Sequence, residues 1–352
     1  MKVNGNNYRT IWYDKEYEDV KIIDQRFLPF KFVVETINSS DEMAEAIAEM
    51  HLRGAGLIGA AAAWGLFLAV KKSGKWEDIE KASEKLAATR PTAVNLQAAL
   101  NKMNNALQSL NEDKRETAAF ELAQGISDND AESCRQIGIN GLNIIKEIKN
   151  NKKGKRINIL THCNAGWLAF VDYGSALAPI YEAFDNGIDV HVYVDETRPR
   201  NQGARLTAWE LGMHNVPHTL IADNTGGHLM QEGMIDMVIV GSDRVAANGD
   251  VANKIGTYLK ALAAADNNIP FYVAFPSTTF DSNILHGSNI PIEERSPNEV
   301  LFIDGIYQGK EIEVRIAPEK TSAINFGFDI TPNRLVTAYI TEKGVFKANE
   351  LL

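Results

Sequence analysis

The residues best able to carry out chemistry follow short apolar runs in the second half of the chain. Cys163 comes just after the run Ile157–Thr161, and Asp243 comes just after Met237–Val240. If both runs are neighbouring parallel strands, their carboxyl ends meet at one edge of a sheet, where ligands bind. A thiol and a carboxyl group placed there can exchange protons with one substrate. Each residue alone is weak evidence, because such a cysteine usually packs in a core and such an aspartate usually caps a helix.

Three basic residues stand at predicted helix starts or turns, where they could bind an anion. Arg53 precedes the stretch Gly54–Gly59. Arg90 precedes a predicted helix start, and Lys254 lies in a predicted turn. An arginine beside the free N–H groups of a helix start suits a phosphate. The alternatives are close helix packing through small residues, an exposed arginine, and a solvated lysine in the first turn of a helix, and the residues alone leave them open.

The stretch Gly54–Gly59 matches the G-x-G-x-x-G fingerprint of dinucleotide-binding proteins, but its context does not. That fingerprint follows a strand and opens a helix. Here the preceding segment, Asp41–Leu52, places Met43, Ile47 and Met50 on one helical face. We therefore expect no nicotinamide or flavin cofactor at this segment.

Hydrophobic periodicity divides the chain into a helical first part and an alternating second part. Before about residue 128 the pattern indicates a short β meander followed by helices. Later, short apolar runs alternate with stretches long enough for crossover helices, which predicts a parallel sheet covered on both faces. We therefore expect an α/β protein with a smaller, mainly helical domain at 1–128 and a sheet domain at 129–352. Helices are predicted over roughly 41–52, 55–72, 77–88, 94–110, 115–125 and 129–149, and strands at Ile157–Thr161, Val190–Val194, Thr219–Ala222, Met237–Val240 and Phe271–Ala274.

Composition and charge exclude several classes of protein. The chain has 352 residues, of which 45% are hydrophobic and 23% charged, as in a folded protein of about two domains. With 36 basic and 46 acidic residues, the net charge of −10 disfavours non-specific nucleic-acid binding. A small anionic substrate held by a local basic cluster stays compatible with this charge. The uncharged stretch Gly54–Val70 is short and only mildly apolar, so we expect a buried helix and no membrane span.

The cysteines and histidines predict neither a disulfide framework nor a metal site. The two cysteines are Cys134 and Cys163, and the first residues lack the apolar segment of a secretory signal, so we expect a cytoplasmic protein. The motifs H-E-x-x-H, paired C-x-x-C, G-x-x-x-x-G-K-S/T and G-x-S-x-G are absent. The seven histidines are scattered along the chain.

Together these stretches strongly resemble one family, which contains the methylthioribose-1-phosphate isomerases and the regulatory subunits of translation initiation factor 2B. The similarity runs over nearly the whole chain, from Ile22 to Val345. Chance agreement at so many long motifs is implausible. The most specific stretches are Arg53–Ala55, Arg90–Leu96, Thr161–Gly166, Asp195–Trp209, Gly241–Gly256 and Pro291–Arg295.

The resemblance implies a small N-terminal domain, a Rossmann-like C-terminal domain, a homodimer, and neither a redox cofactor nor a metal. It implies an isomerase that converts a cyclic aldose 1-phosphate into the open-chain ketose 1-phosphate, with 5-methylthioribose 1-phosphate of methionine salvage as the first expectation. Cys163 and Asp243 match the family's catalytic pair. The family's substrate-binding positions are matched by Arg53, Gly54, Ala55, Arg90, Gln202, Asn253 and Lys254.

The chain departs from the family's pattern at three places, of which Phe326-Gly327 stands where the family commonly has a Pro-Ala pair, and the other two keep other functions open. The family commonly has proline at the position of Gly56 and alanine at the position of Ser242. Both positions adjoin expected site residues, so 5-deoxyribose 1-phosphate and ribose 1,5-bisphosphate stay open as substrates. A non-catalytic regulatory subunit like the initiation-factor relatives is the main alternative, and a nucleotide-binding dehydrogenase is the third.

The implied reaction explains why an acid and a second polar group are needed. Phosphate on the anomeric oxygen locks the sugar as a ring, so ring opening must precede the move of hydrogen from C2 to C1. In our first hypothesis Asp243 gives a proton to the ring oxygen and the Cys163 thiolate removes the C2 proton, which requires cationic neighbours or a helix N-terminus to lower the pKa of Cys163. In the second hypothesis a hydride moves directly from C2 to C1, and both side chains only polarise oxygens.

Overall fold

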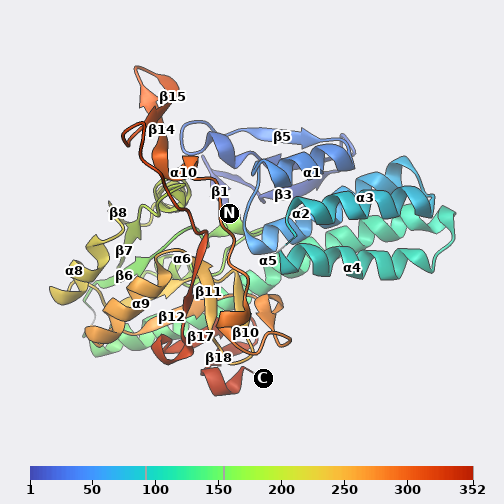
Figure 1. Ribbon diagram of the computed structural model, residues 1–352. Coiled ribbons are helices and arrows are strands. Elements are labelled where there is room, and N and C mark those ends of the chain that lie inside the picture. The colour runs from blue at the N-terminus through green and yellow to red at the C-terminus, as the bar shows by residue number, and fades with distance from the viewer. Residues whose placement is uncertain (92, 154, 352) are drawn as a thin grey trace.

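The N-terminal part of the protein combines a small sheet with a group of helices (Figure 1). The computed structural model describes residues 1–91, 93–153 and 155–351. An antiparallel sheet with β4 at its centre confirms a short meander at this end of the chain. Its strands are β3 (Ile11–Asp14), β4 (Asp19–Ile23) and β5 (Val34–Ile37), preceded by the ribbon of β1 (Lys2–Val3) and β2 (Asn6–Asn7). The helices are α1 (Ser40–Ala48), α2 (Ala55–Lys72), α3 (Trp76–Thr89) and α4 (Val94–Gln108).

Helix α2 is the buried centre of this part. By length and composition its 18 residues could cross a membrane, but 78% of them are buried inside the structure. Helices α1, α3, α4 and α5 all pack against it, so apolar residues are needed on every side of the helix. The ring of Trp64 stacks on that of Tyr13 with centroids 5.7 Å apart. The prediction of a buried helix is confirmed.

Helix α5 (Glu112–Asn151) is a single helix of 40 residues, where the sequence predicts two. The predicted break contains Ser127, a residue that is unfavourable inside a helix when its hydroxyl competes for main-chain bonds. Here Ser127 is buried, and its Oγ accepts a hydrogen bond from the indole N–H of Trp64 (2.9 Å). Tertiary packing therefore carries the helix through this position. The boundary at 128 and 129 stays a prediction, and α5 runs across it.

The second part is built on a seven-stranded sheet with the order β18-β17-β12-β9-β6-β7-β8. Six strands are parallel, and β18 is an antiparallel edge. Chain order therefore reverses between β6 and β9, the doubly wound arrangement of Rossmann-like folds. The five predicted strands are all present. The strands are β6 (Ile157–Thr161), β7 (Val190–Asp195), β8 (His218–Ile221), β9 (Met237–Val240), β12 (Phe271–Ala274), β17 (Ala338–Thr341) and β18 (Gly344–Phe346).

Two separate apolar layers cover the two faces of this sheet, as predicted for a buried parallel sheet. Ile159 belongs to the layer with α5, α6 and α7, whereas its neighbour Leu160 belongs to the layer with α8 and α9. Alternate residues of one strand thus face opposite layers. The covering helices are α6 (Ala178–Asp185), α7 (Ala208–Met213), α8 (Thr225–Gln231) and α9 (Thr257–Asp266).

A smaller sheet and a protruding hairpin complete the structure (Figure 1). The smaller sheet has the order β13-β10-β11-β16 and lies beside the carboxyl ends of the large sheet's central strands. The hairpin of β14 and β15 extends away from the body of the protein. The remaining elements are β10 (Arg244–Ala246), β11 (Val251–Lys254), β13 (Phe280–Asp281), α10 (Asn298–Leu301), β14 (Phe302–Tyr307), β15 (Lys310–Arg315) and β16 (Phe328–Thr331).

Candidate active site

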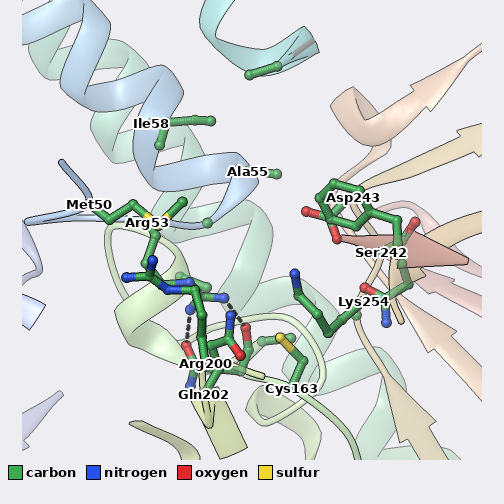
Figure 2. Close-up of a pocket in the computed structure, with 18 of the residues that line it drawn as sticks. Met50, Arg53, Ala55, Ile58, Cys163, Arg200, Gln202, Ser242, Asp243 and Lys254 are labelled. Carbon is green, nitrogen blue, oxygen red and sulfur yellow. Dashed lines mark hydrogen bonds between the residues drawn. The ribbon is translucent and has the colours of Figure 1, made fainter. Parts of the chain in front are cut away.

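A cavity of about 350 Å³ lies between the start of α2 and the carboxyl ends of β6 and β9 (Figure 2). These strands are neighbours at the point where strand order reverses, which is where open α/β sheets bind ligands. The structure brings the whole predicted residue set to this cavity. The lining includes Arg53, Gly54, Ala55, Arg90, Cys163, Gln202, Asp243, Asn253 and Lys254. Position 92, inside the predicted stretch Arg90–Leu96, lies outside the described residues.

The loop after β6 holds Cys163 through its main chain. The N–H of Cys163 donates to Thr197 Oγ1 (2.8 Å), and its carbonyl accepts from Thr207 Oγ1 (2.7 Å). Its φ of 64° lies in the left-handed region, which non-glycine residues adopt only when their surroundings enforce it. These contacts fix the direction in which the thiol enters the cavity.

Burial raises the pKa of the Cys163 thiol, and the nearby cations Arg53 and Lys254 only partly offset this effect. The lowered pKa that the thiolate hypothesis requires is therefore not supported by the surroundings of Cys163. A thiolate is costly here because a charge loses its hydration in a buried site. A bound phosphate would also pair with the same two cations and weaken their support for a thiolate. The neutral thiol is thus the form of Cys163 that the site favours.

Asp243 stands in the loop after β9, on the other side of the reversal point from Cys163 (Figure 2). Its N–H donates to the carbonyl of Ala252 in β11 (3.0 Å), which ties the loop to the smaller sheet. Burial raises the pKa of the carboxyl, while Lys254 and Arg53 act in the opposite direction. The protonated acid therefore persists to higher pH than in water, as a proton donor to a substrate requires.

Arg53 is positioned by the loop that also carries Cys163. Its guanidinium donates to Asn164 Oδ1 (2.5 Å) and to the Asn164 carbonyl (2.8 Å). The next residue, Gly54, caps α2 with φ = 109°, and a Cβ there would lie 2.4 Å from the carbonyl oxygen of Ala169. Only glycine fits this close approach. Because α2 follows α1 and no strand, the dinucleotide interpretation of Gly54–Gly59 lacks its structural context.

Lys254 is the last residue of β11, which corrects the alternative of a lysine in the first turn of a helix. Strand β11 pairs with β16, and the Lys254 Nζ lies 4.7 Å from the centroid of the Phe328 ring. Burial lowers the pKa of Lys254, whereas Cys163 and Asp243 raise it. The preceding Asn253 donates through Nδ2 to Thr257 Oγ1 (3.0 Å) at the start of α9.

Reasoning from the sequence assigned no role to several residues that line the cavity. Arg90 lies 3.7 Å from Glu293, which in turn lies 2.9 Å from Arg295. The last two residues belong to the stretch Pro291–Arg295, which carried the resemblance but no assigned role. Asn164 was included only as part of the stretch Thr161–Gly166. Their polarity and their place inside a motif were the available signals, but the contacts of Glu293 with Arg90 and of Asn164 with Arg53 join residues that lie far apart in the chain.

The cavity is basic although the chain is acidic. Its described lining includes eight Lys and Arg residues against four Asp and Glu residues. Several of the cations already have acidic partners, as in the pairs Arg200–Glu299 (2.9 Å) and Arg205–Asp304 (3.1 Å). Among the described residues no carboxylate lies within ion-pair distance of Arg53 or Lys254. These two cations, together with Arg90, form the part of the wall best suited to an anion.

One group of possible metal ligands borders the site, but one of its carboxylates already contacts basic side chains. His162, Asp195 and Asp223 lie close together. The Nδ1 of His162 is 2.9 Å from Asp195 Oδ2, and the ammonium of Lys260 is 3.1 Å from the same oxygen. A cationic lysine at this carboxylate disfavours a divalent ion there. The absence of a metal site stays a prediction.

Comparison with known proteins shows the family to which this chain belongs. The profile of the initiation factor 2 subunit family matches residues 51–348. The chain belongs to this family. A methylthioribose-1-phosphate isomerase from Desulfatibacillum aliphaticivorans is 54% identical, over 99% of this chain and 97% of that protein. The resemblance inferred from the motifs is confirmed.

Two solved structures of the family share the fold along nearly the whole chain. The crystal structure of 5-methylthioribose 1-phosphate isomerase from Pyrococcus horikoshii OT3 has a TM-score of 0.84 and 39% identity, and covers 99% of this chain and 98% of that one. The structure of translation initiation factor eIF-2B subunit delta from A. fulgidus has a TM-score of 0.81 and 38% identity, with 96% of each chain covered. The α/β fold class is confirmed.

Two of the three departures from the family's pattern have local explanations in the structure. A Cβ on Gly56 would lie 2.3 Å from Asp130 Oδ1, so Asp130 fills the space that a larger residue needs. The hydroxyl of Ser242 donates to the carbonyls of Arg244 (3.1 Å) and Ala252 (3.2 Å). Both departures are therefore matched by contacts within the protein and do not require a different sugar.

Proposed function

We propose that this chain isomerises 5-methylthioribose 1-phosphate to 5-methylthioribulose 1-phosphate, the aldose–ketose step of methionine salvage. The observation that carries the proposal is the meeting of Cys163 and Asp243 in one cavity with Arg53, Arg90 and Lys254. Relatives that cover almost the whole chain at 54% identity bear the name of this enzyme. A purely regulatory subunit has no need for a buried acid and a thiol beside three cations.

The cations supply an anchor for the substrate's phosphate. In the described part of the chain no carboxylate lies within ion-pair distance of Arg53 or Lys254, and Arg90 forms a contact of 3.7 Å with Glu293. Arginine binds phosphate oxygens in a bidentate manner, and free N–H groups at the start of α2 add to the attraction. Anchoring the phosphate on C1 would place the sugar ring between Cys163 and Asp243, and Gln202 and Asn253 are the expected partners of its hydroxyls.

The remaining wall of the cavity supports an uncharged substituent on C5. Met50 and Ile58 contribute apolar surface to the lining (Figure 2). A methionine side chain is flexible and polarisable, and it packs well against a thioether. The nearby cations Arg200 and Arg205 are already paired with acids, so a second phosphate would have to displace those partners. These features favour the methylthio sugar over the bisphosphate.

Ring opening is the step assigned to Asp243. The acid protonates the ring oxygen as the bond from that oxygen to C1 breaks, which leaves an oxocarbenium ion at C1 and a carboxylate on Asp243. A buried carboxylate stabilises this cation strongly because little water screens their attraction. Burial raises the pKa of Asp243, so its acid form persists to higher pH than that of a free carboxyl, which supports its role as the proton donor.

The favoured neutral form of Cys163 supports the second of our two hypotheses. Proton abstraction would need a thiolate beside a protonated Asp243, but burial opposes a charge on both groups and favours the thiol. We therefore propose that hydride moves from C2 to C1 and that the hydroxyl on C2 returns its proton to Asp243, which completes the ketone and restores the acid. The polarisable thiol of Cys163 stabilises the cationic transition state.

The function is tested by substrate turnover. The purified protein is mixed in turn with the 1-phosphates of 5-methylthioribose, 5-deoxyribose and ribose 5-phosphate, and the ketose products are followed by phosphorus NMR. We expect conversion of all or some of these sugars, with the highest kcat/KM for the methylthio compound. A higher kcat/KM for another sugar would reassign the substrate, and no conversion of any sugar would favour a regulatory subunit.

We also propose that the protein is a cytoplasmic homodimer that binds neither nucleic acid nor a membrane. The net charge of −10 and the burial of α2 support the last two points, and two unpaired cysteines suit a reducing compartment. Exposed apolar side chains such as Tyr307 and Val314 on the protruding hairpin support a contact with a second copy. Sedimentation equilibrium should give twice the mass of the chain, and a single chain mass at micromolar concentration would contradict the dimer.

A further inference from the structure

Glu210 is a fully buried carboxyl group that the proposed reaction does not use. It lies in α7 with no exposed surface. Four donors surround its two oxygens. Oε1 accepts from Asn164 Nδ2 (2.9 Å) and the Leu168 N–H (3.0 Å), and Oε2 accepts from the Trp167 N–H (3.0 Å) and the Tyr181 hydroxyl (3.0 Å). A buried carboxyl with this many partners has a defined role in the structure around it.

The contact with Asn164 sets the direction of a side-chain amide at the cavity. Asn164 donates its NH₂ group to Glu210 and to Thr207 Oγ1 (3.2 Å). Its amide oxygen must then point the other way, toward the guanidinium of Arg53 (2.5 Å). The main-chain carbonyl of Asn164 accepts from the second guanidinium nitrogen (2.8 Å), so both oxygens of this residue hold Arg53. Arg53 in turn faces the cavity (Figure 2).

We propose that Glu210 is a positioning residue for phosphate binding: by fixing the amide of Asn164, it holds Arg53 in the orientation that receives the phosphate of the substrate. This inference rests on the proposed function, because that function assigns Arg53 to the phosphate. Glu210 acts through Asn164 and does not itself line the cavity. It therefore influences the affinity for phosphate more than the chemical step.

The donors around Glu210 match a carboxylate better than a neutral group. Every partner of Glu210 is a donor, and an ionised carboxylate only accepts. A glutamine would turn its own NH₂ group toward one pair of donors, and the Asn164 amide could regain a partner by turning over. That turn would place an NH₂ group against the Arg53 guanidinium, where two donors repel. Burial raises the pKa of Glu210 to about 7, although its hydrogen bonds favour the charged form.

The main chain packs tightly against the carboxyl of Glu210. A Cβ added to Gly166 would lie 1.8 Å from Glu210 Oε2, so the main chain after Cys163 approaches the carboxyl directly. Glu210 therefore sits beneath the loop that carries both Cys163 and Asn164. A simpler role, holding only the turn at Trp167 and Leu168, would stabilise the fold without changing phosphate affinity, and the test must separate the two roles.

The test measures binding of inorganic phosphate by calorimetry, which needs no turnover, together with kcat and KM for 5-methylthioribose 1-phosphate. Glu210→Gln and Asn164→Ala should each raise the phosphate Kd and the KM about tenfold and change kcat less than threefold. The double variant should bind phosphate no more weakly than the weaker-binding single variant, because both changes disrupt the same chain of contacts from Glu210 through Asn164 to Arg53. Tyr181→Phe is the matched control, since it removes one donor from Glu210 without touching Asn164, and it should leave Kd within twofold.

Three results would overturn the role of Glu210. They are a normal phosphate Kd in folded Glu210→Gln, effects of Glu210→Gln and Asn164→Ala that multiply in the double variant, and a fall in kcat at unchanged KM. If Glu210→Gln does not fold, a normal Kd in Asn164→Ala alone rejects the path through that residue. Phosphate binding without turnover in the wild-type protein would reject the proposed reaction while leaving the role of Glu210 testable.

Discussion

Replacing Asp243 by asparagine will lower kcat by about 10³-fold, within the range of about 10²–10⁴ that a positioned acid contributes. Asparagine has nearly the same shape but no proton of suitable acidity, so the ring oxygen leaves C1 without protonation. The KM should change little, because the cations that hold the phosphate remain. Initial rates measured by phosphorus NMR at saturating substrate give both constants.

The control for this variant is a carboxylate outside the cavity. Asp266 is exposed at the end of α9, and Asp266→Asn should keep the wild-type kcat. Circular dichroism and the melting temperature establish that Asp243→Asn is folded. A folded Asp243→Asn variant with a kcat within tenfold of wild type would remove the acid from the reaction.

Replacing Cys163 by alanine will lower kcat by about 10²-fold, the order found when a single stabilising group is removed from an active site. The loss of kcat should be smaller than that of Asp243→Asn. The thiol transfers no proton and only stabilises the positive charge on the sugar in the transition state for hydride migration. Cys163→Ser should fall between alanine and wild type, since a hydroxyl is polar but less polarisable. Steady-state kinetics of the two variants at one pH give the comparison.

The matched control for the thiol is the second cysteine. Cys134 is buried in α5 outside the described lining of the cavity, so Cys134→Ala tests the general effect of losing a buried sulfur and should keep kcat near wild type. Complete loss of turnover in both Cys163→Ala and Cys163→Ser would contradict a stabilising thiol and restore the thiolate base of our first hypothesis.

Much of the fold could be predicted because its signals are local. Apolar runs such as Met237–Val240 are short, uncharged and followed by polar loops, so their identity as buried parallel strands was evident. Because the carboxyl ends of neighbouring parallel strands meet at one edge of a sheet, Cys163 and Asp243 could then be placed at that edge without any knowledge of the loops. Helix α5 is one helix where two were expected, and the bond between Trp64 and Ser127 at the expected break joins residues 63 positions apart.

The finer features of the site depend on contacts between distant residues, for which the sequence holds no local signal. Lys254 was expected near a helix start, but pairing of β11 with β16, some 75 positions later, makes it the end of a strand. Cationic neighbours of Cys163 could be proposed from the motifs. The depth of burial that raises the pKa of the thiol could not be predicted from the motifs. This burial is the reason for preferring hydride transfer over proton abstraction.

The central claim is that this cavity moves hydrogen from C2 to C1 as hydride, with Asp243 as the acid and Cys163 as a neutral thiol. The most direct measurement runs the isomerisation in deuterated water and reads C1 of the ketose 1-phosphate by proton NMR. The account predicts a C1 that carries two protons and no deuterium after many turnovers. One deuterium at C1 per turnover would show a proton exchanged with solvent, and would contradict the hydride route.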